Sequence, residues 1–181
     1  MKKIEHPEVI LPEREARLAE IREKFACCPP DCGISADDFF MDCALAAASV
    51  AGDSGDVPVG CAVVRDGRLL SLAANGREVY RDATCHAECA AISEACRALG
   101  GWRLVGCTLY VTLEPCPMCA GAIINSRVPR VVVGARDERS GAFGSAVDLC
   151  AIPLYQKPEL CFGVRENECR AVLQHFFKLR R

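Results

Sequence analysis

The sequence contains no long apolar run, no excess of positive charge and no internal repeat. None of its 181 residues belongs to a run of 18 apolar residues, so we expect no membrane span. The chain begins with charged residues and prolines, so we expect no signal peptide and a cytoplasmic location. With 22 basic and 24 acidic residues the formal net charge is −2, and any contact with nucleic acid requires a local basic patch. The lack of a fixed repeat argues against a solenoid.

Cysteine, by contrast, is abundant. Fourteen cysteines are present, and several lie inside helix or strand patterns, which indicates small buried side chains in a reducing compartment. Cys27, Cys28 and Cys32 flank Pro29-Pro30. An ordinary turn with buried thiols is favoured there over a second metal site, because no histidine or fourth thiol lies nearby in the sequence.

The chain divides into an N-terminal arm, residues 1–35, and a main domain, residues 36–181. The first eleven residues are polar, which predicts a loose arm, and an amphipathic helix is predicted over about 12–26. Ser35 followed by Asp38 is the pattern of a capping box, which predicts a helix through about residue 50.

Strands and helices alternate in the predicted main domain. Asp66-Gly67 is a strong hairpin signal between predicted strands at 59–64 and 69–74, and a polar loop follows over 76–85. The other predicted elements are a helix over about 86–99, a strand at 104–113, a helix from Pro117, a strand at 130–134, a poorly patterned segment at 146–163, and a helix over about 166–179 with Val172, Leu173, Phe176 and Phe177 facing inward. This order indicates an α/β fold, a three-layer α/β/α sandwich around a mixed sheet of about five strands.

The strongest chemical signal is the stretch TLYVTLEPCPMCAGAIINS at residues 108–126. A buried strand leads into Glu114-Pro115, and Cys116 and Cys119 then stand at positions i and i+3 of a helix start. The positive end of a helix lowers the pKa of a thiol and favours the thiolate, the form that binds metal. Upstream, the tetrapeptide CHAE supplies His86 and Glu88. H-x-E followed by P-C-x-x-C is the established signature of zinc-dependent nucleobase deaminases.

Three protein ligands predict a catalytic site for one Zn²⁺ per chain, with the fourth position left for water: His86, Cys116 and Cys119. Zinc lowers the pKa of its water toward about 7, and Glu88 is the predicted proton shuttle. On a regular helix His86 and Glu88 would point apart, so we expect His86 at the very start of its helix. We therefore expect two helix N-termini to converge on the metal.

A closed structural site is the alternative reading of the same residues. Cys85 or Cys89 would then supply a fourth ligand, and the protein would be a scaffold or a non-catalytic subunit. The open site is favoured because it explains the presence of Glu88, which would act on a metal-bound water as a proton shuttle.

Over residues 36–181 the chain resembles bacterial tRNA-specific adenosine deaminases of the cytidine deaminase-like superfamily. The resemblance rests on Thr84–Glu88, on residues 108–145 and on the C-terminal FFKLRR. It implies a homodimer that converts adenosine to inosine at the wobble position of a tRNA anticodon loop. It also implies that Asn75 contacts the target nucleoside and that Arg136 and Asp137 begin a loop lining the substrate. Taken without the resemblance, the Gly-rich, charged segment 135–145 is either a substrate loop or a solvated connector.

The sequence also differs from this family. Gln156-Lys157 stands where an Asn-His pair is expected near the substrate, and residues 1–35 have no counterpart. A local basic surface is available from Arg127, Arg130, Arg136, Arg139 and residues 178–181. Because the motif fixes the reaction and not the ring, deamination of free nucleobases or nucleosides, such as guanine, cytosine or cytidine, stays open as the alternative.

Overall fold

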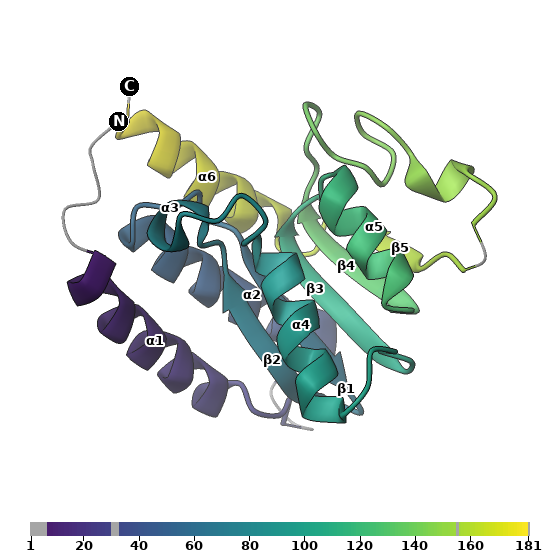
Figure 1. The fold of residues 1–181 in the computed structure, drawn as a ribbon, viewed down its shortest axis with the longest axis horizontal. Helices are drawn as coiled ribbons and strands as arrows, with labels where there is room; N and C mark the ends of the chain where they lie inside the picture. Colours follow the sequence, from purple (N-terminus) through teal and green to yellow (C-terminus); the bar gives the residue numbers. More distant parts are fainter. Residues whose placement is uncertain (1–6, 30–32, 155, 181) are drawn as a thin grey trace.

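A single mixed sheet forms the centre of the protein. The computed structural model describes residues 7–29, 33–154 and 156–180, with only the backbone of residues 7–10. Within these residues the strand order is β2-β1-β3-β4-β5 (Figure 1). β1 (Gly60–Arg65) is antiparallel to both β2 (Arg68–Ala74) and β3 (Cys107–Leu113), whereas β4 (Arg130–Ala135) and β5 (Glu159–Phe162) continue from β3 in parallel. The predicted mixed sheet of about five strands is confirmed.

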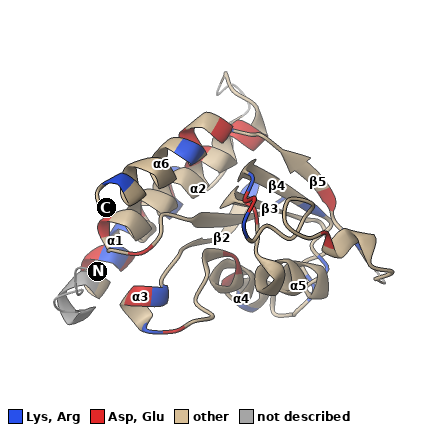
Figure 2. Cartoon of the chain, turned by 90° about the horizontal axis from the view of Figure 1, so that it is seen from above, with Lys and Arg blue, Asp and Glu red and all other residues tan. Residues whose placement is uncertain are grey.

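Helices cover both faces of this sheet, so the predicted three-layer architecture is confirmed. In Figure 2, α1 (Pro7–Lys24), α2 (Ala36–Asp53) and α6 (Glu166–Lys178) lie on one side, and α4 (Ala87–Leu99) and α5 (Pro117–Asn125) lie on the other. Successive side chains of a strand point to opposite faces, so the strands contribute to two separate apolar cores.

The helix α2 lies very close to β1 because its inner face is built from small residues. The Ser35 hydroxyl accepts a hydrogen bond from the Asp38 N–H at 3.0 Å, which confirms the start of the predicted capping box. Ala44 and Ala48 are fully buried against β1. A Cβ placed on Gly60 would lie 1.9 Å from the carbonyl oxygen of Ala44, so only glycine fits there.

The predicted hairpin is confirmed between β1 and β2. Asp66 and Gly67 have φ values of 52° and 69°, the left-handed backbone that a two-residue hairpin turn requires. The predicted helix over 86–99 is also confirmed as α4, which ends at Gly100 in the left-handed region.

Several predicted boundaries are wrong. The first helix begins at Pro7, so residues 7–11 are helical and not a loose arm, whereas residues 1–6 lie outside the described residues. Proline is tolerated at the first position of a helix, where its missing N–H removes no bond. The predicted loop over 76–85 contains the short helix α3 (Arg77–Tyr80). The strand predicted from residue 104 begins at Cys107, because Gly106 turns the chain with a φ of 78°.

Two segments differ from the prediction because their secondary structure or side-chain burial depends on packing against other elements. The poorly patterned segment 146–163 contains the 3-10 helix η1 (Leu149–Ala151) and the strand β5, which pairs with β4. On α6, Phe176 is buried as predicted, whereas Phe177 is 49% exposed.

Cys27 is exposed and not a buried thiol, Cys28 is half-buried, and Cys32 lies outside the described residues. Among the helices that the structure describes, none combines the length and apolar character needed to cross a bilayer.

Candidate metal centre and active site

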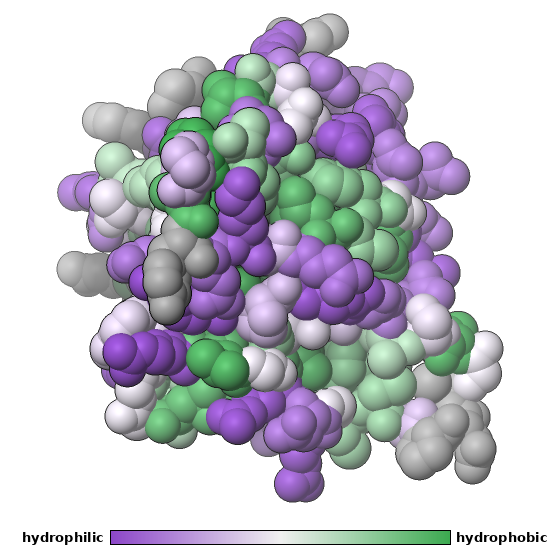
Figure 3. Space-filling model, turned by 90° about the vertical axis from the view of Figure 1, so that its right-hand side faces the viewer, coloured by the Kyte–Doolittle hydropathy of each residue, from purple (hydrophilic) through white to green (hydrophobic). Residues whose placement is uncertain are grey.

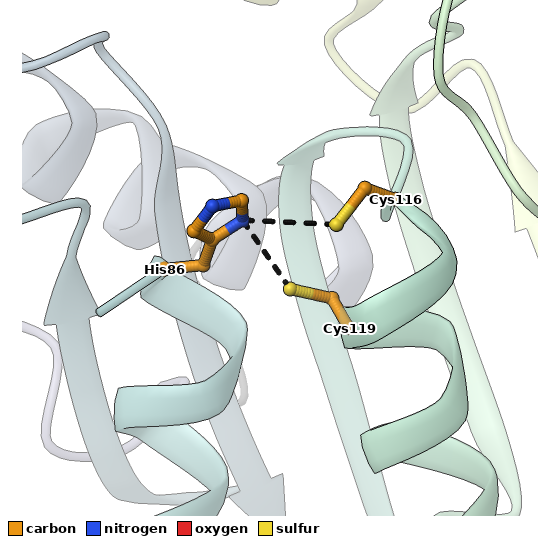
Figure 4. Close-up of side chains that lie close together, drawn as sticks. All are labelled: His86, Cys116 and Cys119. Atoms are coloured by element: carbon orange, nitrogen blue, oxygen red, sulfur yellow. Dashed lines mark hydrogen bonds between the residues drawn. The ribbon is translucent and has the colours of Figure 1, made fainter. Parts of the chain in front are cut away.

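Two helix N-termini meet at the C-terminal end of β3, as predicted. His86 is the N-cap residue of α4 with an extended backbone, and Cys116 is the N-cap residue of α5. Cys119 follows in the first turn of α5. Figure 4 shows the imidazole and the two thiols pointing toward one another from the two helix starts.

The spacing of these three side chains fits a zinc ion. His86 Nδ1 lies 3.5 Å from Cys119 Sγ and 3.8 Å from Cys116 Sγ, and all three ligand atoms lie within 4.8 Å of one another. Tetrahedral zinc with ordinary Zn–N and Zn–S bond lengths separates nitrogen from sulfur by about 3.6 Å. The imidazole and the pair of thiols are therefore positioned to bind a metal ion without rearrangement.

The electrostatic surroundings favour the metal-binding form of Cys116. Hydrogen bonds from Cys119 and His86 lower the pKa of Cys116 to about 3, although burial opposes the shift. The hydrogen bond to Cys116 in turn raises the pKa of His86. A thiolate next to a nitrogen donor is the arrangement that a divalent cation stabilises further.

The described residues do not complete a closed structural site. Within them, the only group of histidine, cysteine or acidic side chains that can hold a metal is the set of three already named. Cys89 Sγ is 3.8 Å from Cys119 Sγ but is not part of this group, and Cys85 faces a separate cavity beside α1. The open site is thus the better description, with one coordination position free for water.

Glu88 lies in the first turn of α4 and lines the same cleft as His86 and Cys116. The cleft has a volume of about 190 Å³. Only 4% of the Glu88 side chain is exposed, and burial raises the pKa of its carboxyl above the ordinary range. A raised pKa brings a carboxyl group closer to the range in which general acid–base catalysis is efficient, so this environment suits Glu88 to proton transfer.

Asn75 lines the same cleft and directly follows the last residue of β2. Its Nδ2 donates to the carbonyl oxygen of Val57 at 3.2 Å, and its backbone N–H donates to Val59 O at 2.9 Å. The side chain is buried and lines the cleft together with His86. The structure therefore brings Asn75 to the metal centre, and its contact with a nucleoside stays a prediction.

The predicted substrate loop is held by Glu114, a residue to which the sequence pattern assigns no role. Its buried carboxylate accepts hydrogen bonds from the backbone N–H groups of Asp137, Phe143 and Ser145 at 3.2, 3.0 and 3.2 Å, and from the Ser145 hydroxyl. Gly141 is required beside it, because a Cβ there would lie 2.4 Å from Glu114 Cδ. The sequence offered one indication of this role: Glu114 is an acidic residue directly before Pro115-Cys116 to which the metal motif gives no function.

The two predicted loop residues occupy different places. Asp137 lines the metal cleft, and its carboxylate accepts bonds from the N–H groups of Arg139 and Ser140. Arg136 is exposed outside the cleft, with its guanidinium carbon 4.0 Å from the centre of the Phe162 ring. Gln156 lies farther away, where its Nε2 donates to Arg127 O beyond the end of α5, opposite the end that carries the cysteines.

Comparison with known proteins agrees with this geometry. Residues 34–135 match the model of the cytidine and deoxycytidylate deaminase zinc-binding region, which spans α2 to β4 and both ligand motifs. The chain therefore belongs to the family of zinc-dependent cytidine and deoxycytidylate deaminases. The predicted zinc cofactor is confirmed by this family and by the ligand geometry.

More particular likeness exists within this family. The tRNA-specific adenosine deaminase of Bacillus subtilis (strain 168) is 45% identical over 143 residues, covering 78% of this chain and 89% of the relative. A solved structure from work on A-to-I editing by tRNA:A34 deaminases has a TM-score of 0.72 and 43% identity, covering 74% of this chain and 98% of its own. A guanine deaminase from Bacillus subtilis is less similar, with a TM-score of 0.52 and 28% identity over 78% of this chain and 91% of its own.

Proposed function

We propose that this protein is a zinc-dependent hydrolase that converts adenosine to inosine at the wobble position of a tRNA anticodon loop. The likeness to tRNA-specific adenosine deaminases supports the reaction class and the substrate. One observation favours RNA over a free base as the substrate: a large basic groove continues outward from the small metal cleft.

The proposed reaction adds water to C6 of adenine and releases ammonia. A zinc ion held by His86, Cys116 and Cys119 would supply hydroxide at neutral pH. Glu88, buried beside these ligands, would carry one proton from the water to the ring nitrogen and then the proton of the new C6 hydroxyl to the leaving amine. Asn75, which lines the cleft, would hold the nucleoside, and Asp137 lies where the cleft meets the outer groove.

The outer groove has the properties of a surface for single-stranded RNA. It has a volume of about 840 Å³ and shares Val57, Leu113, Asp137 and Ser140 with the metal cleft. Four cations line it, namely Arg136, Arg139, Lys178 and Arg180, along with the exposed ring of Phe177. Cations bind phosphates, and an exposed aromatic ring stacks on an unpaired base. A free nucleobase needs neither feature.

The predicted basic surface is only partly assembled. Arg136, Arg139 and residues of the C-terminal segment come together in the outer groove. Arg130 does not join them, because both of its terminal nitrogens bind the Asp37 carboxylate at 2.8 and 2.7 Å near the start of α2. An arginine committed to such a bidentate pair is not available to a phosphate.

A homodimer and a cytoplasmic location are kept as parts of the proposal. The face that carries η1 shows broad apolar areas in Figure 3. Four apolar side chains of α5 and the following loops are more than a third exposed: Met118, Val147, Ile152 and Leu154. Apolar areas of this kind mark protein interfaces. Sedimentation of the chain and of an Ile152→Asp variant tests this part, and a monomeric unmodified chain would exclude it.

A side-by-side substrate assay tests the proposed function. The zinc-loaded chain is incubated with an anticodon stem-loop carrying adenosine at the wobble position, and separately with free guanine, cytosine, cytidine and adenosine. A stem-loop carrying guanosine at that position is the matched RNA control. We expect inosine from the adenosine stem-loop alone. Deamination of a free base or nucleoside with an unchanged stem-loop would instead support the alternative function.

A further inference from the structure

The N-terminal helix α1 reaches the wall of the active site through one buried arginine. Arg14 is 2% exposed, and its Nη2 donates to the carbonyl oxygens of Ala74 and Asn75, both at 2.8 Å. α1 lies outside residues 34–135, the part that matches the family model. In Figure 1 it runs alongside β2, next to the α3 segment.

A second contact joins α1 to the same segment. The Tyr80 hydroxyl donates to Glu15 Oε1 at 2.7 Å, and the Arg14 guanidinium lies 5.6 Å from the centre of the Tyr80 ring. Gly76 fits under this ring, because a Cβ there would approach it to 2.5 Å. The stretch from Ala74 to Tyr80, which leads toward His86, is thus held from outside by two neighbouring residues of α1.

The contacts of Asn75 show why this support matters. The backbone of Asn75 is fixed on one side by its N–H bond to Val59 O and on the other by the Arg14 bond to its carbonyl oxygen. With both backbone groups held, the side chain has a defined direction into the cleft. Hydrogen bonds from a charged donor are about twice as strong as neutral ones, so Arg14 supplies the stronger restraint.

The hydrogen-bonding capacity of the buried Arg14 guanidinium is only partly used. Within the part of the chain that the structure describes, its Nε and Nη1 are buried without a hydrogen-bond partner, which is unfavourable by itself. Burial raises the pKa of the Asp56 carboxyl, and hydrogen bonds from the Glu78 and Val79 N–H groups at the start of α3, together with the charge of Arg14, oppose this shift. Arg14 and Asp56 therefore both form hydrogen bonds with the segment between β2 and α4.

We propose that Arg14 is a positioning residue for substrate binding, which acts by fixing Asn75 and the adjoining segment against α1. The inference rests on the proposed role of Asn75 in holding the nucleoside. Arg14 touches neither the metal ligands nor Glu88 in the described structure, so its loss should weaken substrate binding and leave the chemical step largely intact.

The test compares Arg14→Met with Arg17→Met on the same helix. Arg17 is a matched control because its ion pair with Asp53 lies on the surface, away from Asn75. For Arg14→Met we expect KM to rise about tenfold with kcat changed less than about twofold, the size expected for one charge-assisted bond. Arg14→Lys should recover part of the loss, because lysine also donates to carbonyl oxygens. In an Asn75→Ala background, Arg14→Met should add little.

Hydrogen exchange provides a readout that does not depend on the substrate. We expect amide exchange over residues 75–86 to be at least about fivefold faster in Arg14→Met and unchanged in Arg17→Met. Unchanged exchange would overturn the proposal, as would a kcat loss with constant KM or full additivity with Asn75→Ala. The kinetic comparison uses whichever substrate the unmodified chain deaminates. An inactive RNA arm therefore counts against the proposed function, while exchange still decides the role of Arg14.

Discussion

The Glu114 carboxylate accepts a hydrogen bond from the Phe143 N–H at 3.0 Å, across 29 residues of sequence. The same carboxylate holds the N–H groups of Asp137 and Ser145, so one side chain fixes the loop that borders the metal cleft. Its removal leaves three backbone donors without a partner.

We predict that Glu114→Ala lowers the free energy of unfolding by about 3 kcal/mol, since each stranded donor costs about 1 kcal/mol or more. Glu114→Gln should lose roughly half as much, because one acceptor oxygen remains. Urea denaturation measures both. Glu138→Ala, in the same loop but exposed, is the control and should be neutral. Equal stability of Glu114→Ala and the control would show that the loop does not depend on this carboxylate.

Glu88 is expected to act on protons and not to hold the metal. Glu88→Gln should keep about one zinc per chain and lower kcat by about 10²-fold or more, because the amide cannot shuttle a proton. Glu94→Gln, further along α4 and paired with Arg22, should retain full turnover. Metal analysis and single-turnover deamination on the same preparations check the prediction. Full activity of Glu88→Gln would remove the shuttle assignment.

The open metal site predicts different results for neighbouring cysteines. Cys119→Ala should lose zinc on dialysis against a chelator, whereas Cys89→Ala should retain about one zinc per chain. The two sulfurs are only 3.8 Å apart, so the pair of variants separates ligation from proximity. Loss of zinc from Cys89→Ala would instead indicate a site closed by a fourth protein ligand.

The pair of Asp37 and Arg130 should make stability dependent on acid pH. The hydrogen bond from Arg130 holds the pKa of Asp37 below its ordinary value of 3.8, although burial opposes it. A lowered folded-state pKa contributes stability above the unfolded pKa, and this contribution is lost as pH falls through the folded value. We expect the Tm of the unmodified chain to fall more steeply below about pH 4 than that of Asp37→Asn.

Removal of the exposed carboxylate in Asp53→Asn serves as the control, since that side chain is 64% exposed. Its Tm should follow that of the unmodified chain from pH 7 downward. Parallel curves for Asp37→Asn and the unmodified chain would mean that the ion pair does not couple folding to protonation.

Close packing between α2 and β1 makes Gly60 intolerant of any side chain. Gly60→Ala should lower the free energy of unfolding by about 3 kcal/mol or more, because the new Cβ meets the backbone of Ala44. Gly101→Ala is the matched control, since nothing lies within 4 Å of a Cβ there, and should change stability by less than about 0.5 kcal/mol. Similar stability of the two variants would contradict the close approach.

The local pattern of the sequence determined the elements and the chemistry of the metal site. The H-x-E and P-C-x-x-C motifs carry donors whose spacing requires helix starts, so the sequence alone predicts His86, Cys116 and Cys119 as ligands. Asp66-Gly67 likewise fixes its own turn, because the required backbone angles depend on two adjacent residues.

Only the tertiary structure reveals which distant residues contact the segments around the metal site. Nothing near Glu114 in the sequence reveals that its partners are backbone groups at residues 137–145, and nothing near Arg14 reveals that it binds Asn75. Phe176 and Phe177 are adjacent and chemically identical in the sequence, so the sequence predicts burial of both. Only Phe176 is buried, because the way α6 packs against α2 turns Phe177 toward solvent. Local periodicity describes one element at a time, whereas long-range hydrogen bonds and burial depend on how the elements pack. The hydrogen bonds of Glu114 and Arg14 around the metal site could therefore be identified only from the tertiary structure.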